Sequence, residues 1–126
     1  MNKFFKNVLM SIATLVAVTS VFAQDANLPQ SIEGRYTNKV TGNSNSFSMK
    51  EIKAEGENFE ALFTLWGSNN CGARNQKVKG LIQGGIATFN VSLPVQCTSE
   101  YVATIDFGKK VGTYKTIDYN GTYEFK

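Results

Sequence analysis

The feature that most constrains this chain is a regular alternation between short runs of β-branched and aromatic residues and short segments rich in turn-forming residues. No stretch after residue 23 has the period of a helix. Eight runs have the composition of strands. They cover residues 32–40, 46–53, 59–66, 76–83, 86–93, 101–107, 110–117 and 122–125. The sequence therefore predicts an all-β protein.

Short connections between consecutive strands favour an up-and-down meander, and eight strands are enough to close a meander into a small antiparallel barrel. Phe59, Ala61, Phe63 and Leu65 alternate along one strand and are expected to face its core. A β-sandwich is the alternative architecture. The immunoglobulin type is not favoured, because Trp66 precedes both cysteines.

Residues 1–23 have the organisation of a signal peptide. Lys3 and Lys6 form a positive start, residues 8–18 are mostly apolar, and residues 21–23 fit a small-x-small cleavage site. We expect cleavage after Ala23, which leaves 24–126 as a single domain, secreted or periplasmic. The apolar run is about a dozen residues, shorter than the roughly 20 that span a bilayer, so no stable membrane insertion is expected.

Charge and composition exclude several classes of function. The chain has 13 Lys and Arg against 10 Asp and Glu, and loss of Lys3 and Lys6 with the leader leaves 11 against 10. This near neutrality does not favour nucleic-acid binding. Histidine is absent, which removes Ser-His-Asp triads, Cys-His dyads and His-ligated zinc. We therefore predict a non-enzyme with no cofactor and no metal site.

Cys71 and Cys97 are the two cysteines of the chain. Their separation does not resemble a C-x-x-C redox site, and an oxidising compartment favours pairing. We predict a structural disulfide. In the chain-entropy description, closing a loop of this size contributes roughly 3.5 kcal/mol.

An eight-stranded barrel holds either a filled interior or one small ligand at an open end. For a ligand-binding mouth the candidate residues are aromatic or carry polar groups beside strand ends. Tyr36, Asn38 and Tyr114 are expected to supply polar groups, and Phe63 an apolar wall. Trp66 is expected at the rim, beside the loop that holds Cys71.

Short motifs resemble the avidin/streptavidin family of small β-barrels. Residues 34–38 (G-R-Y-T-N) and the turn at 42–44 (G-N-S) are similar to that family's first hairpin. Residues 56–63, 89–93 and 112–114 are similar to later strands. The resemblance covers about 85 residues in rough register. It implies a barrel in which Asn38 and Ser44 face the ureido group of a biotin-like ligand.

Other positions depart from that family. Phe63 stands where the family has a hydroxyl-bearing tyrosine, and Leu93 and Tyr114 stand where it has tryptophan walls. Each unmade polar contact costs about 1–3 kcal/mol. We therefore expect the barrel shape without tight binding of biotin.

Two functions are compatible with the sequence. The first is a non-enzymatic carrier that takes a small apolar or amphipathic molecule at its open end. The alternative is a module that binds an extracytoplasmic protein, such as an inhibitor of, or immunity protein against, a hydrolase. Its contact surface would be the loops 67–75 and 94–99, joined by Cys71 and Cys97. Asn70 and Arg74 are the candidate residues of the first loop, with Arg74 as the anchor. The sequence does not set the oligomeric state.

Overall fold

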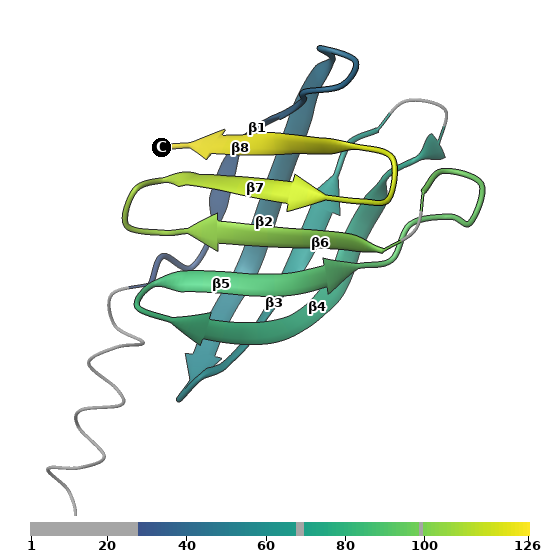
Figure 1. The fold of residues 1–126 in the computed structure, drawn as a ribbon. Helices are drawn as coiled ribbons and strands as arrows, with labels where there is room; N and C mark the ends of the chain where they lie inside the picture. Colours follow the sequence, from purple (N-terminus) through teal and green to yellow (C-terminus); the bar gives the residue numbers. More distant parts are fainter. Residues whose placement is uncertain (1–27, 68–69, 99) are drawn as a thin grey trace, which may run out of the picture.

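The computed structural model describes residues 28–67, 70–98 and 100–126, which form one closed antiparallel barrel of eight strands (Figure 1). The predicted signal peptide and its cleavage site lie outside the described residues, as do Ser68, Asn69 and Ser99. The strands are β1 (Ile32–Asn38), β2 (Ser44–Glu55), β3 (Asn58–Leu65), β4 (Ala73–Gln83), β5 (Ile86–Val91), β6 (Tyr101–Asp106), β7 (Val111–Lys115) and β8 (Asn120–Phe125).

Closure of the sheet is made by β1, which pairs with β2 on one side and with β8 on the other. Thr37 of β1 stands opposite Ser44 of β2 and opposite Thr122 of β8. Each strand therefore has two hydrogen-bonded neighbours, and no edge is left to recruit another chain. This pairing confirms the barrel and excludes the sandwich.

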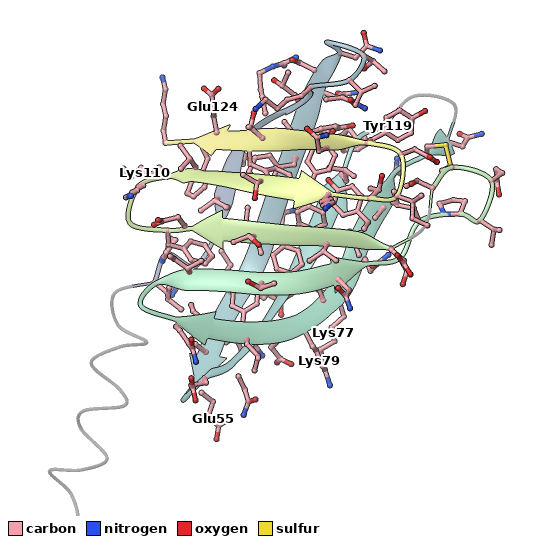
Figure 2. All side chains as sticks on the ribbon, in the orientation of Figure 1. Glu55, Lys77, Lys79, Lys110, Tyr119 and Glu124 are labelled. Carbon is pink, nitrogen blue, oxygen red and sulfur yellow. A yellow bond between two sulfur atoms is a disulfide. The ribbon has the colours of Figure 1, made fainter. Side chains whose placement is uncertain are left out.

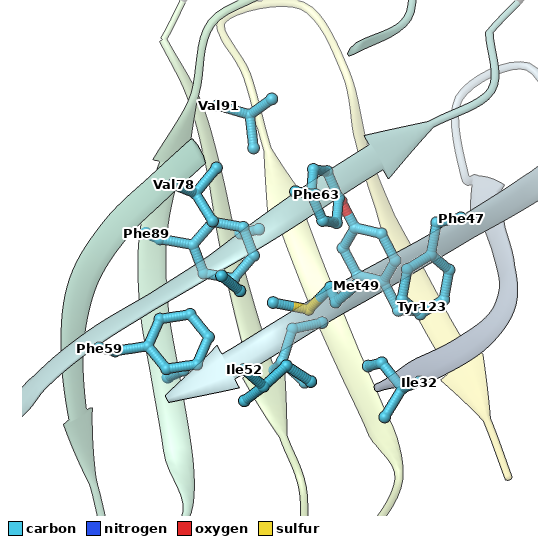
Figure 3. Packing of buried hydrophobic residues seen from close by; sticks show 14 of the residues in the cluster. Ile32, Phe47, Met49, Ile52, Phe59, Phe63, Val78, Phe89, Val91 and Tyr123 are labelled. Atoms are coloured by element: carbon cyan, nitrogen blue, oxygen red, sulfur yellow. The ribbon is translucent and has the colours of Figure 1, made fainter. Parts of the chain in front are cut away.

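The core is filled by inward-facing aromatic and aliphatic side chains (Figure 3). Phe59 stacks on Phe89 with ring centroids 5.7 Å apart, and Phe47 meets Tyr123 edge-on at 4.8 Å. The predicted inward face of β3 is confirmed, since Phe63 is completely buried. Aromatic rings bury a large apolar area each, so these contacts contribute strongly to the stability of the core.

Two β-bulges change which residues of a strand face inward. In β2 the register shifts between Lys50 and Lys53, where Glu51 has a φ of 50°. Odd-numbered Met49 is buried before the bulge, and even-numbered Ile52 is buried after it. A second shift in β4 coincides with Asn75, whose φ is 46°. An extra residue in one strand bends it and restores its apolar side to the core.

The two ends of the barrel differ. One end carries the β2–β3, β4–β5 and β6–β7 turns, marked by Glu55 and Lys110 in Figure 2. Gly84 and Gly85 form the β4–β5 turn with φ of 57° and 78°, which confirms the predicted two-residue turn. The other end carries the β1–β2, β3–β4, β5–β6 and β7–β8 connections, and we call it the mouth. Among the described residues, no helix has the length and apolarity to cross a membrane.

Candidate functional site at the mouth of the barrel

A cavity of about 450 Å³ opens at the mouth, and we call it the mouth cavity. Its walls come from strands around the barrel and from all four connections at that end. The aromatic and aliphatic lining residues are Tyr36, Leu65, Leu93, Tyr101, Tyr114 and Tyr119. The amide and hydroxyl lining residues are Asn38, Thr41, Asn43, Ser44, Asn45, Thr98 and Thr116. A volume of this size accommodates a small organic molecule.

Four tyrosines, Tyr36, Tyr101, Tyr114 and Tyr123, pack together where the mouth cavity meets the core, and we call them the tyrosine cluster. The Tyr101 and Tyr114 rings are parallel with centroids 4.9 Å apart, and Tyr36 meets Tyr114 edge-on at 6.1 Å. The Tyr101 and Tyr123 hydroxyls are hydrogen-bonded to each other. The Tyr36 hydroxyl donates to the backbone carbonyl of Trp66. These contacts fix the rings before any ligand arrives.

Burial keeps the tyrosine cluster uncharged. Desolvation raises the pKa of Tyr114 to about 12, and the neighbouring Tyr36 adds to the effect. Burial also raises the pKa of Tyr36, Tyr101 and Tyr123 above the ordinary value. At neutral pH every phenol in the cluster is therefore protonated and able to donate a hydrogen bond.

Small neighbours make room for the Tyr114 ring. On β6 and β8 the residues opposite Tyr114 are Ala103 and Gly121. A Cβ added at Gly121 would lie only 2.4 Å from Cε1 of Tyr114. Only glycine leaves this space, so the position of the ring at the mouth depends on residue 121.

Asn38 ends β1 at the mouth and stabilises the turn that follows it. Its Oδ1 accepts hydrogen bonds from the backbone N–H groups of Val40, at 2.9 Å, and Thr41, at 3.2 Å. Among the described residues, the Asn38 Nδ2 amino group donates to no protein acceptor, so it is available to a ligand. Asn38 therefore combines a structural role with a free donor at the cavity.

The Cys71–Cys97 disulfide is present, as predicted, with a Cα–Cα distance of 5.5 Å (Figure 2). Both cysteines line the mouth cavity. The bond joins the β3–β4 connection to the β5–β6 connection, so it fixes two sides of the mouth relative to each other. Such a cross-link reduces the conformational freedom that a ligand would otherwise have to remove.

The structure brings four of the predicted ligand-binding residues together: Tyr36, Asn38, Ser44 and Tyr114 all line the mouth cavity. It does not bring the other two there. Phe63 points inward two positions deeper along β3 than Leu65 and is sealed in the core. The neighbour of Leu65, Trp66, therefore faces the outside, because successive side chains alternate, and it is 45% exposed.

The predicted protein-binding loop is shorter than the sequence suggests. β4 begins at Ala73, so Arg74 lies in a strand rather than in the loop. The strand extends this far because the bulge at Asn75 keeps Ala73 paired with Leu65. Arg74 lies over the Trp66 ring, with its guanidinium carbon 5.0 Å from the ring centroid. Both side chains, with Asn70, border a separate small surface hollow.

Sequence reasoning missed Tyr101, Tyr119 and Thr98 as lining residues. Tyr101 begins β6 immediately after a connection at the mouth, and Tyr119 lies in the β7–β8 connection. In an up-and-down barrel alternate connections share one end, so aromatic residues beside every second connection were a usable signal. No sequence pattern marks Thr98 as a residue that lines the cavity.

A wider depression of about 930 Å³ lies over the outer face of β5, β6 and β7. The exposed side chains there come from neighbouring strands of one face, including Asn90, Thr113 and Lys115. We place the candidate site in the mouth cavity, because side chains converge on it from around the barrel. Within the described ranges, no group of three or more His, Cys, Asp or Glu residues is arranged to hold a metal ion.

Comparisons with protein-family models, with curated proteins and with solved structures give no match to this chain. The resemblance to the avidin/streptavidin family therefore stays a prediction.

Proposed function

We propose that the chain from Gln24 onward is a secreted or periplasmic, non-enzymatic protein that binds a small amphipathic molecule in the mouth cavity. The observation that carries this proposal is the pre-organised mouth itself. A cavity of about 450 Å³ is lined by packed tyrosine rings and by amide and hydroxyl groups. Concave sites with an apolar surface and a few placed polar groups are the usual form of small-molecule sites.

Two further observations support the proposal. The Cys71–Cys97 disulfide suits an oxidising compartment outside the cytoplasm. Burial raises the pKa values of Tyr36, Tyr101 and Tyr114, which line the mouth cavity, so these three phenols do not act as bases at neutral pH. The described lining contains no carboxylate, lysine or histidine to take that role. The cavity can hold a molecule but offers no evident acid–base chemistry.

Native mass spectrometry of protein purified from secreting cells tests the proposal. We expect a retained small mass that disappears in Leu93→Trp, because the larger side chain fills the mouth cavity. Val95→Trp is the matched control. Val95 is 95% exposed and does not line the mouth cavity, so this variant should keep the ligand. A ligand retained equally by both variants would exclude the mouth cavity as its site.

A second candidate function is recognition of an extracytoplasmic protein, and one observation favours it. Trp66 and Arg74 form an exposed stacked pair beside the disulfide-linked connection. Tryptophan and arginine are common anchors of protein interfaces. The test starts from a partner protein that the wild-type chain captures as bait. We expect an Arg74→Ala bait to capture that partner at least tenfold less, and a Lys79→Ala bait, changed on the same strand, to capture it as the wild type does. Equal capture by both variants would remove this candidate.

A further inference from the structure

The charge of the mouth cavity restricts its ligand. Asp, Glu, Lys and Arg make up 18% of the chain, yet none of the described residues that line the cavity belongs to these types. A charged ligand would lose its hydration on entry without gaining an ion pair. The lining therefore selects against ions of either sign.

The polar groups of the mouth cavity also limit which chemical class of ligand can bind there. In the ranges that the structure describes, the Asn38 amino group has no protein acceptor and can donate to a ligand. Within the described part of the chain, the buried Thr98 Oγ1 has no hydrogen-bond partner, and no hydrogen bond involves Tyr114 Oη. A purely apolar ligand would remove the Asn38 amino group and Tyr114 Oη from water without pairing them, at a cost of about 1–3 kcal/mol each. Hydroxyl groups, which donate and accept, would satisfy both kinds of site.

The aromatic groups supply the third restriction. Tyr36 is partly exposed at the mouth, whereas Tyr114 is 5% exposed, because it packs edge-on against Tyr36 at 79° and against the parallel Tyr101 ring 4.9 Å away. The face of an aromatic ring is electron-rich and attracts weakly positive C–H groups. A ligand that suits the exposed part of Tyr36 and the polar groups beside it has an apolar C–H face and a polar edge.

We propose that the mouth cavity binds an uncharged, hydroxyl-rich ring, which is the chemistry of a neutral sugar. The C–H face of the ring lies against the partly exposed Tyr36, and its hydroxyls hydrogen-bond to Asn38 Nδ2 and Tyr114 Oη. This inference rests on the proposed binding role of the mouth and narrows it to one ligand class.

NMR titration of the ¹⁵N-labelled chain from Gln24 onward tests the inference. The probes are glucose, galactose, N-acetylglucosamine and maltose, with glucuronate as the charged match to glucose and decanol as an apolar probe. We expect at least one neutral sugar to cause saturable shifts of the Asn38 side-chain amide, and glucuronate to bind at least tenfold more weakly than glucose. Saturable binding of decanol alone would overturn the sugar inference and leave the proposed function standing. No saturable shift with any probe, together with no retained mass in native spectra, would overturn both.

Two variants locate the sugar. Asn38→Asp keeps an oxygen for the Val40 and Thr41 N–H groups but replaces the free donor with a charge, so sugar affinity should fall at least tenfold. Asn90→Asp adds the same charge on the exposed face of β5 and should bind as the wild type does. Tyr114→Phe removes only Oη and should weaken binding about fivefold, which tests the site even if Asn38→Asp does not fold. Unchanged affinity in Tyr114→Phe and in a folded Asn38→Asp would overturn the assignment.

Discussion

The hydrogen bond between Tyr101 and Tyr123 gives a prediction with a definite asymmetry. Tyr123 is completely buried, so Tyr101→Phe leaves its hydroxyl without a partner and without access to water. An unsatisfied buried polar group costs about 1–3 kcal/mol, and we expect about 2–3 kcal/mol of unfolding free energy to be lost. Tyr101 borders the mouth cavity, where water can replace Tyr123. Tyr123→Phe should therefore cost only about 1 kcal/mol.

The double variant Tyr101→Phe/Tyr123→Phe removes both hydroxyls and keeps the shapes of both rings. Replacing both partners of a buried hydrogen bond by apolar groups is nearly neutral, so this variant should lie within about 1 kcal/mol of the wild type. The coupling energy between the two positions is then about 2–4 kcal/mol.

Urea unfolding followed by far-UV circular dichroism at pH 7 and 25 °C measures these differences as shifts of the midpoint at constant slope. Tyr119→Phe controls for loss of a phenol hydroxyl outside the cluster and should change stability by less than about 0.5 kcal/mol. Additive effects of the two single substitutions, or a larger loss in Tyr123→Phe than in Tyr101→Phe, would refute this reasoning.

Three further predictions concern stability. Burial raises the pKa of Tyr101 and of Tyr123 in the folded state. The unfolding free energy should therefore stay constant up to about pH 10, where both phenols are neutral in the unfolded chain, and should fall above it because the unfolded chain then loses protons that the folded chain keeps. Urea midpoints from pH 8 to 11 should show a loss of up to about 3 kcal/mol per pH unit from the pair, which the double Phe variant lacks. Replacing Cys71 and Cys97 by serine should cost about 3.5 kcal/mol for a sequence separation of 26, and equal melting temperatures of both proteins would contradict this. Gly121→Ala places a Cβ 2.0 Å from the Thr37 carbonyl oxygen and should cost at least about 1–3 kcal/mol, measured by thermal unfolding.

Much of the fold was predictable because its signals are local. Alternation placed Phe59 and Phe63 on the inward face of β3, and the Gly84–Gly85 pair set the β4–β5 turn. The bulges at Glu51 and Asn75 were not predictable in this way. Each depends on how a strand matches its partner, and the residue types at those positions do not report that match.

The candidate site was predictable only in part. Tyr36, Asn38 and Tyr114 were found because aromatic and amide groups beside strand ends carry a recognisable signal. Trp66 carries the same signal, but it follows the inward-facing Leu65 and therefore faces outward, because successive side chains alternate. The partners of the tyrosine hydroxyls, including Tyr101, depend on contacts between strands that are distant in the sequence.

The sequence by itself determined the all-β class, the eight strands and the single possible disulfide, because strand composition, turn residues and the number of cysteines are local properties. Only the tertiary structure decided that β1 pairs with β8 and closes a barrel. It also decided that the core fills one end while the tyrosine cluster leaves a cavity at the other. The physical reason is that closure and ring packing depend on long-range register, which fixes which side chains face one another across the barrel.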